Sequence, residues 1–130
     1  MQFFGKINEA NIVLNVLSLG DDKLLDNNGV KQESIGQAYL ESVTGWPANQ
    51  WIWANGVRKN PMGVGTEWDS ANQIFWAAQP YSNWTKDIAT GEWISPAGAV
   101  PELTQEEKDQ NKYYIWDEEN QSFELVTHPY

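Results

Sequence analysis

The chain has 130 residues, which fits one domain and leaves little room for two. It contains no Cys, which excludes disulfides and thiolate zinc sites, and its single His argues against multi-histidine metal centres and Ser-His-Asp or Cys-His catalysis. The net charge of −10 disfavours nucleic acid as a partner, because phosphate binding depends on Lys and Arg. No apolar run approaches the roughly 18 residues that a membrane span needs, so we expect no membrane insertion. Residues 1–10 show no basic segment followed by an apolar one, so we expect no secretory signal.

Aromatic residues are unusually frequent: the chain has eight Trp, five Tyr and four Phe. Each buries about 150–250 Å² when it packs, and a chain of this size cannot easily bury all of them within itself. Because Trp and Tyr are enriched at interfaces, we expect about half of the Trp side chains to face a partner. The candidate interface residues are Trp51, Trp53, Trp76, Tyr81, Trp84 and Trp93.

The first part of the chain reads as a β-hairpin followed by a helix. Residues 2–19 contain two short apolar runs around a turn at residues 8–11. The run Asp-Asn-Asn-Gly at 26–29 is a strong turn signal, and its spacing does not fit a calcium-binding EF-hand loop. Apolar periodicity predicts a helix over residues 32–43, with Ser34 as its N-cap and with Gly45 and Pro47 ending it.

From residue 50 onward the sequence predicts β structure. Trp51 and Trp53 are two residues apart, which places them on the same face of a strand. The pair at 55–56, Asn-Gly, is the strongest short hairpin signal, and residues 57–59 would start the return strand. The segment 102–112 is acidic and polar, so we expect it to be exposed.

A repeat organises the second half. Residues 68–75 and 116–123 both read W-D-x-x-N-Q-x-F, and residues 87–93 follow the looser form D-x-x-x-G-x-W. Asp is favoured at the first position of a type I turn, where its carboxylate accepts nearby backbone N–H groups. Asn or Gly three or four residues later tolerates the left-handed conformation that closes such a loop. Asp69, Asp87 and Asp117 are therefore predicted to form turns, and the flanking aromatics to pair across the strands.

The predicted fold class is mainly β, or α+β with one short helix. Residues 1–45 form the N-terminal hairpin and helix, and residues 46–130 form consecutive antiparallel Trp-rich hairpins, as one structural domain or two small lobes. Aliphatic side chains and half of the Trp side chains are expected to form the core. The aliphatic core residues expected are Val13, Val16, Leu17, Leu40, Ile52, Ile74 and Ile115.

The order of these motifs resembles a family of short proteins of tailed bacteriophages, notably those that infect marine cyanobacteria and other marine bacteria. The resemblance covers most of the chain. The residues that carry it are Asn55-Gly56, Arg58-Lys59-Asn60, Pro80-Tyr81-Ser82, Trp84, Trp93, Pro96 and Tyr114-Ile115-Trp116-Asp117-Glu118-Glu119. It implies a virion structural component, made in the bacterial host cytoplasm and bound to other virion proteins in several symmetric copies. The position in the particle (capsid decoration, connector, tail or baseplate) does not follow from it.

Two other functions compete with this one. Flat Trp and Tyr faces on a β-platform can stack on sugar rings, so the alternative is a carbohydrate-binding module that recognises a host surface glycan. An enzyme is the third hypothesis, because eighteen carboxylates place some pair at the roughly 5–9 Å that a glycosidase needs. Nothing in the sequence selects such a pair, so we expect no enzyme and no catalytic, metal or cofactor-binding residues.

Overall fold

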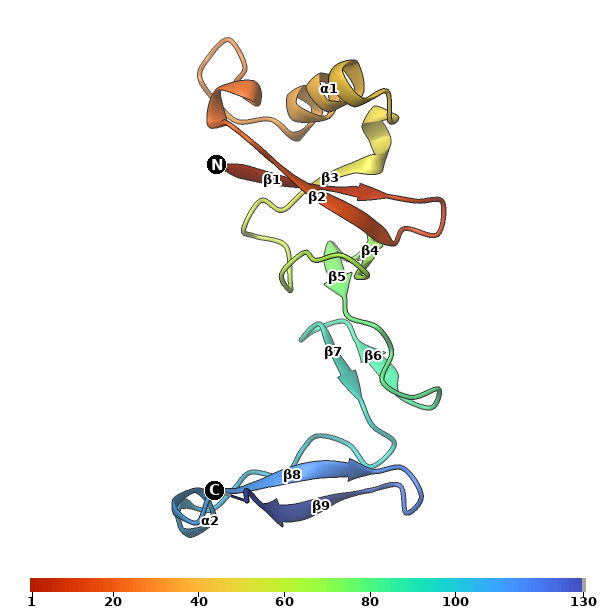
Figure 1. The fold of residues 1–130 in the computed structure, drawn as a ribbon, viewed down its shortest axis with the longest axis vertical. Helices are drawn as coiled ribbons and strands as arrows, with labels where there is room; N and C mark the ends of the chain where they lie inside the picture. Colours follow the sequence, from red (N-terminus) through yellow and green to blue (C-terminus); the bar gives the residue numbers. More distant parts are fainter. Residues whose placement is uncertain (130) are drawn as a thin grey trace. The chain divides into compact units, whose positions relative to one another are not determined.

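The computed structural model describes residues 1–129, and its secondary structure is mainly β (Figure 1). This confirms the predicted fold class. The strands are β1 (Gln2–Ile7), β2 (Val13–Leu19), β3 (Trp51–Trp53), β4 (Glu67–Asp69), β5 (Ile74–Trp76), β6 (Thr85–Asp87), β7 (Glu92–Ile94), β8 (Lys112–Asp117) and β9 (Ser122–Thr127). The helices are α1 (Glu33–Thr44) and α2 (Gln105–Asp109), with 3-10 turns η1 (Asp21–Lys23) and η2 (Ala48–Gln50).

Contacts within the chain define two compact units. Unit 1 comprises residues 1–78 together with 88–91, and unit 2 comprises residues 79–87 and 92–130. The boundary expected at residue 45 falls inside unit 1, because β3 hydrogen-bonds to β1 and so joins the first 45 residues to the segment that follows.

A three-stranded antiparallel sheet of order β2-β1-β3 forms the centre of unit 1. The predicted N-terminal hairpin is confirmed as β1 and β2, with Gln2 opposite Leu19. The Asn8 side chain holds its turn, because its Oδ1 accepts hydrogen bonds from the backbone N–H groups of Ala10 and Ile12 at 2.9 and 3.0 Å. The turn geometry and the apolar pattern of the strands thus fix the same register.

Helix α1 confirms the predicted helix within one residue at each end. Its N-cap is Gln32 rather than Ser34, and no side chain caps the first turn. Gly45 ends the helix in the left-handed conformation, at φ 77°. Gly36 lies directly against the Phe4 ring, where a Cβ atom would come within 2.5 Å of Phe4 Cζ. Glycine therefore lets the helix approach the sheet closely.

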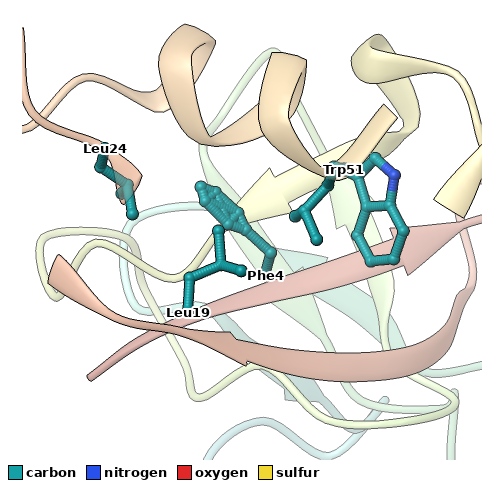
Figure 2. Packing of buried hydrophobic residues seen from close by; sticks show 5 residues of the cluster. Phe4, Leu19, Leu24 and Trp51 are labelled. Carbon is teal, nitrogen blue, oxygen red and sulfur yellow. The ribbon is translucent and has the colours of Figure 1, made fainter. Parts of the chain in front are cut away.

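Hydrophobic clusters cover both faces of this sheet. On the helix side, α1 covers Phe4, Leu19, Leu24 and Trp51 (Figure 2), and Leu40 of the helix completes this cluster. On the other side, the sheet packs against hairpin β4–β5 through Ile7, Val13, Ile52, Trp68 and Phe75. Neighbouring strand residues alternate between the two clusters, as the pleat of a strand requires. Unit 1 therefore has its own core.

The strong hairpin signal at Asn55-Gly56 does not form a hairpin, so that prediction is wrong. Strand β3 ends at Trp53 and pairs with β1, and no return strand follows it among the described residues. Gly56 does adopt a left-handed φ of 81°, and the Asn55 side chain accepts a hydrogen bond from the Val57 N–H. Asn55 and Gly56 thus form a turn, but β3 pairs with the distant strand β1 instead of with the expected strand at residues 57–59.

The W-D-x-x-N-Q-x-F repeat forms hairpins β4–β5 and β8–β9, as predicted. Asp69 accepts hydrogen bonds from the backbone N and side-chain Nδ2 of Asn72 at 3.2 and 2.8 Å, and Asp117 does the same with Asn120 at 3.1 and 2.7 Å. The left-handed residue is not this Asn but the Gln that follows, at φ 58° for Gln73 and 52° in the second copy. This Gln then donates from its side chain to the carbonyl of the residue after the Asp.

Hairpin β6–β7 is the third, looser copy of the repeat, and its turn follows Asp87. Gly91 takes the position that Gln takes in the other two, with φ 78°. A Cβ atom there would lie 3.0 Å from Asn60 Nδ2, which donates to the Gly91 carbonyl at 2.8 Å. This close approach explains why the third copy has glycine.

Unit 2 differs from unit 1 in its packing. Every fully buried hydrophobic side chain in the described part of the chain belongs to unit 1. In unit 2 the aromatics of β8–β9 are only partly buried, and Ile115, expected in the core, is 40% exposed. The segment 102–112 is largely exposed, as expected, but it also forms α2. Thr104 and Glu107 make a capping box there, a local signal that predicts this helix start.

Candidate functional site

Two of the six candidate interface residues lie in the core. Trp51 and Trp76 are each 1% exposed, so neither can form a surface contact and their assignment as interface residues is wrong. Trp51 packs beneath α1, and its indole Nε1 donates to the Trp46 carbonyl at 3.3 Å. Trp76 donates to Asp69 Oδ2 at 3.2 Å, within its own hairpin. Both side chains stabilise unit 1.

Trp53 is also committed to unit 1, although it is only partly buried. Its ring stacks on Phe4 with centroids 6.3 Å apart, and its Nε1 donates to Gln2 Oε1 at 3.0 Å. It packs on the same cluster as Trp51, which confirms the prediction that the two share a face. A residue held by two partners of its own unit is a weak candidate for binding another molecule.

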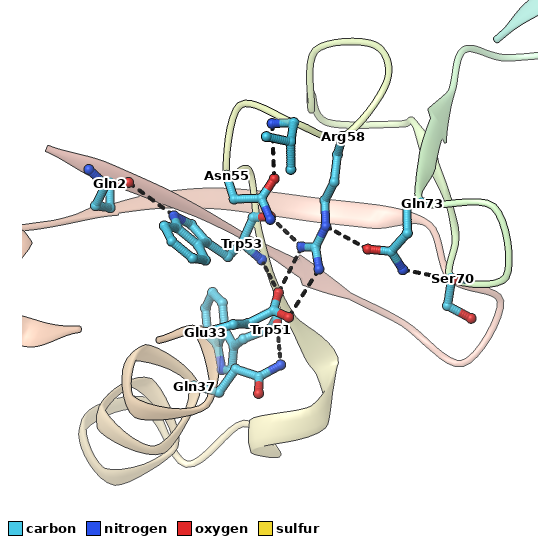
Figure 3. A network of polar contacts seen from close by, with 10 residues as sticks. Gln2, Glu33, Gln37, Trp51, Trp53, Asn55, Arg58, Ser70 and Gln73 are labelled. Carbon is cyan, nitrogen blue, oxygen red and sulfur yellow. Dashed lines mark hydrogen bonds and ion pairs between the residues drawn. The ribbon is translucent and has the colours of Figure 1, made fainter. Parts of the chain in front are cut away.

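The basic pair Arg58-Lys59 also has internal roles. The Arg58 guanidinium forms an ion pair with Glu33 at 2.8 Å, and its side chain is only 10% exposed (Figure 3). It donates to the Trp53 carbonyl and to Gln73 Oε1, and it lies 4.7 Å from the Trp68 ring centroid. Arg58 therefore joins α1, β3 and hairpin β4–β5 in one polar network.

The next two residues of this motif donate hydrogen bonds to backbone carbonyls of the β6–β7 turn and of β5. Lys59 Nζ donates to the carbonyls of Ile88 and Ala89, in the turn between β6 and β7. Asn60 Nδ2 donates to the carbonyls of Phe75 and Gly91 at 3.0 and 2.8 Å. The Arg58-Lys59-Asn60 motif is therefore explained by the fold and needs no external ligand.

The remaining candidates lie in unit 2, where Trp84 is the centre of an aromatic cluster. Its ring centroid lies 5.3 Å from that of Trp116 and 6.5 Å from that of Phe123, both in edge-to-face geometry. Tyr81, which is 39% exposed, lies 6.0 Å from Trp84. The Trp84 indole Nε1 is buried and has no hydrogen-bond partner in the described structure. We call Tyr81, Trp84, Trp116 and Phe123 the unit 2 aromatic cluster.

A pocket of about 300 Å³ opens beside this cluster. Two predicted interface residues, Trp84 and Trp93, both contribute to its wall, and Phe123 supplies a third ring. The polar side chains at its wall are Glu92 and the buried Ser95, whose hydroxyl donates to the Gly98 carbonyl at 2.7 Å. The remaining lining residues are Ile94, Gly98, Ala99 and Val100.

This pocket brings Phe123 together with residues from the segment 84–100. Sequence reasoning selected Trp84 and Trp93 but did not select Phe123 or Glu92. The repeat contained a signal for Phe123, because the aromatic at that position pairs across the hairpin with the Trp of the same motif. No local sequence pattern indicates that Glu92 lines the pocket.

In both copies of the repeat, a residue from outside the hairpin contacts the repeat Gln and the repeat Trp is packed against a neighbouring side chain. In unit 1, Arg58 donates to Gln73 and lies over Trp68. In unit 2, Asn83 Nδ2 donates to Gln121 Oε1 at 2.5 Å, and the neighbouring Trp84 packs on Trp116. The link before β6 therefore supplies the contacts that Arg58 supplies in unit 1, and this fixes the position of Trp84.

The Asp residues of the repeat behave as turn formers. The side-chain and backbone N–H groups of Asn120 hold the pKa of Asp117 below its usual range by stabilising the charged carboxylate. The pKa of Asp26 is lowered in the same way by the N–H groups of Val30 and Asn28. Within residues 1–129, no group of three or more His, Asp or Glu side chains is placed to hold a metal ion. Neither described helix is long and apolar enough to cross a membrane.

Comparison of the chain with family models, with curated proteins and with solved structures finds no match.

Proposed function

We propose that this chain is a non-enzymatic structural or accessory protein of a tailed-bacteriophage particle, and that unit 2 binds another virion protein through its aromatic cluster. Unit 1 is the folded base of the molecule in this proposal. The resemblance of the sequence motifs to a bacteriophage family supports the assignment to a virion. The geometry of unit 2 supports the choice of its aromatic cluster as the binding surface. A capsid, neck, tail or baseplate position is compatible with both.

One observation carries the proposal: unit 2 has aromatic side chains but no fully buried hydrophobic residue among those described. Its four clustered rings are partly buried or exposed, whereas Trp68 and Phe75, the unit 1 equivalents of two of them, are buried. Large aromatic side chains that stay partly exposed are typical of interfaces, where a partner completes the burial. Repeated copies on a symmetric particle would also add weak contacts into strong binding.

The charge of unit 2 indicates the kind of surface that it binds. Unit 2 contains ten acidic and three basic residues, a net charge of −7, against eight and five in unit 1, a net charge of −3. Acidic surroundings favour encounter with a basic protein surface and repel polyanions. We therefore expect a partner that presents Lys and Arg.

Size measurement by light scattering on a sizing column, with and without phage particles that lack the chain, tests the proposal. We expect the chain to co-elute with the particles, Trp84→Ala to weaken this association, and Val57→Ala to leave it unchanged. Val57 is a matched control because it is an apolar side chain in unit 1 that is 85% exposed. A wild-type chain that never associates with such particles would contradict the proposed function.

Carbohydrate binding is the second candidate, and the exposed Tyr81 beside Trp84 is the observation that favours it. Adjacent exposed rings of this kind can stack on sugar units. A change in Trp fluorescence on addition of host-envelope polysaccharide, together with no particle association, would favour this function over the first.

A further inference from the structure

We propose that the outer edge of strand β2 binds the same edge of a second copy of this chain, so that the two sheets join across a two-fold axis. This inference goes beyond the proposed function, because it concerns unit 1 and does not involve the unit 2 aromatic cluster. The sheet of unit 1 has the order β2-β1-β3, so β2 and β3 are its two edges (Figure 1).

Helix α1 covers the edge at β3 with two side chains. The Glu33 carboxylate accepts a hydrogen bond from the Trp53 N–H at 2.8 Å, and Gln37 donates to the Trp51 carbonyl at 2.6 Å (Figure 3). The backbone groups that this edge would offer to another strand are therefore already bonded within the chain. The edge at β3 is closed to a further strand.

Hydrogen bonding on β1 shows which residues of β2 point outward. Backbone N–H and C=O groups of successive strand residues point to alternate sides. Ala54 donates to the Phe3 carbonyl at 3.0 Å, so Phe3 and, two residues on, Gly5 direct their backbone groups towards β3. Their partners on β2 are Ser18 and Val16, which therefore form non-hydrogen-bonded pairs with β1. The backbone groups of Val16 and Ser18 point to the outer edge.

Only the first part of this outer edge is used inside the chain. Val13 exchanges backbone hydrogen bonds of 2.8 Å with residues 65–66. Further along, the Asn15 side chain accepts a hydrogen bond from the Val16 N–H at 2.9 Å. Within residues 1–129, no strand lies opposite the Val16 carbonyl or the N–H and C=O groups of Ser18. Ser18 is exposed, so this part of the edge is open to solvent.

The sequence of β2 lacks the features that prevent edge strands from pairing. Edges of natural sheets are usually protected by Lys, Pro or a bulge. Strand β2 is the longest strand described, and it reads Val-Leu-Asn-Val-Leu-Ser-Leu, without a charge or a Pro. The one irregularity in its pairing lies at its start, between Val13 and Asn15. Residues 15–19 therefore offer a regular and uncharged edge.

The spacing of the outward residues favours a second copy of β2 as the occupant. Val16 and Ser18 lie on either side of Leu17, so a two-fold axis through Leu17 places Val16 opposite Ser18 of the second copy. Each such pair exchanges both N–H···O=C hydrogen bonds, and the Val16 N–H leaves the Asn15 side chain to do so. The two Leu17 side chains then meet across the axis. Because both strands are uncharged, this contact avoids the repulsion that a net charge of −10 causes elsewhere.

Single-cysteine cross-linking tests this register, because the chain has no Cys of its own. Leu17→Cys places the thiol at the axis, where the Cα atoms of a non-hydrogen-bonded pair lie about 4.5 Å apart, within reach of a disulfide. Ser18→Cys is the matched control, because its Cα lies roughly 8 Å from its symmetry mate, which is too far. Ser18 is also the more exposed of the two, so random collision favours the control.

We expect Leu17→Cys to form the disulfide-linked dimer at least about tenfold faster than Ser18→Cys under mild oxidation. Circular dichroism confirms that both variants stay folded. The wild-type chain gives an independent readout, since analytical ultracentrifugation should show a dimer with a Kd of about 0.1–1 mM. Hydrogen exchange of the Ser18 amide should slow as the concentration rises, while the Leu17 amide, which faces β1, stays unchanged.

Two further variants remove or keep the outward donor. Ser18→Pro deletes the N–H, which the β1–β2 ladder does not use, so the strand tolerates it. We expect it to weaken dimerisation at least about tenfold. Ser18→Ala keeps the N–H and should change dimerisation less than twofold.

Three results would overturn the inference: a chain that stays monomeric at about 1 mM, equal cross-linking of the two cysteine variants, or dimers that Ser18→Pro leaves intact. Slower exchange at Ser18 only when phage particles are present would also overturn it, because a strand of another protein would then occupy the edge.

Discussion

The two exact copies of the W-D-x-x-N-Q-x-F repeat have the same turn and the same cross-strand aromatic pair, but they differ in burial. Trp68 and Phe75 are 5% and 1% exposed in unit 1, whereas Trp116 and Phe123 stay partly buried in unit 2. The first copy packs against a sheet that also carries a helix on its other face. The second packs on the Asn83-Trp84 link, and its strand β8 also contacts helix α2.

This difference shows that the motif determines a hairpin, while distant residues determine how deeply its aromatic pair is buried. In unit 1 the aromatic pair belongs to a core, so its main contribution is to the free energy of unfolding. In unit 2 the same pair supports an exposed cluster and a pocket, so its contribution to folding is smaller, and we propose that the remaining surface binds a partner. Substitutions at equivalent positions separate these two roles.

Replacement of the repeat Trp by Ala gives the largest expected effect. We expect Trp68→Ala to lower the free energy of unfolding by about 3–5 kcal/mol, because it empties a fully buried site. Trp116→Ala leaves a site that is already partly open to solvent, so we expect a loss of about 1–2 kcal/mol. Chemical denaturation followed by circular dichroism measures both. Equal losses in the two variants would show that the second copy is buried as deeply as the first.

Removal of the Arg58 guanidinium tests the polar network that joins α1, β3 and hairpin β4–β5, the first copy of the repeat. We expect Arg58→Met to lower the free energy of unfolding by about 2–3 kcal/mol, because it leaves the partly buried Glu33 carboxylate without its ion-pair partner. Lys31→Met is the control, since Lys31 pairs with Asp21 at the surface and such pairs contribute about 0–1 kcal/mol. A loss in Arg58→Met no greater than in the control would contradict the structural role of Arg58.

Gly91→Ala examines the third hairpin. We expect a loss of about 1–2 kcal/mol, because Ala must adopt a left-handed φ of 78° and its Cβ meets the Asn60 side chain at 3.0 Å. Gly98→Ala isolates the backbone cost, since φ is 90° there and nothing lies within 4 Å of the added Cβ. Thermal unfolding of both variants gives the comparison. If Gly91→Ala cost no more than Gly98→Ala, the contact with Asn60 would be unimportant.

Acidification is expected to give the smallest change in the free energy of unfolding. The hydrogen bond from Gln2 and the N-terminal amine lower the pKa of Asp21 to about 2, and hydrogen bonds also lower the pKa values of Asp26 and Asp117. A carboxyl whose pKa is lower in the folded state stabilises the fold above its unfolded pKa of about 4, and this contribution is lost as pH falls towards the folded pKa.

The chain should therefore lose stability between about pH 4 and pH 2. Asp117→Asn removes one of these groups, so the stability gap between wild type and this variant should narrow over the same interval. Urea denaturation at pH 6 and pH 3 measures the gap. A gap that widens on acidification would mean that Asp117 is protonated more easily in the folded chain than in the unfolded chain.

Local signals in the sequence predicted much of the fold. The N-terminal hairpin, helix α1 and the turns of the repeat depend on near neighbours, and all of them form. The hairpin expected at Asn55-Gly56 does not, because β3 pairs with β1, whose residues lie 45 to 49 positions earlier in the chain. Burial of Trp51 and Trp76 likewise depends on segments distant in sequence. The unit 2 pocket was not predicted, although two of its lining residues, Trp84 and Trp93, were named as interface candidates.

Hydrogen exchange of the full chain, alone and bound to phage particles, tests most directly the central claim that unit 1 folds on its own core while a partner completes unit 2. Free in solution, amides of β1 and α1 should exchange far more slowly than amides of β8 and β9, because every fully buried hydrophobic residue among residues 1–129 lies in unit 1. On particles, protection should rise in β8, β9 and residues 81–84 and stay unchanged in unit 1. Equal protection of the two units in the free chain, or a rise confined to unit 1 on binding, would contradict the account.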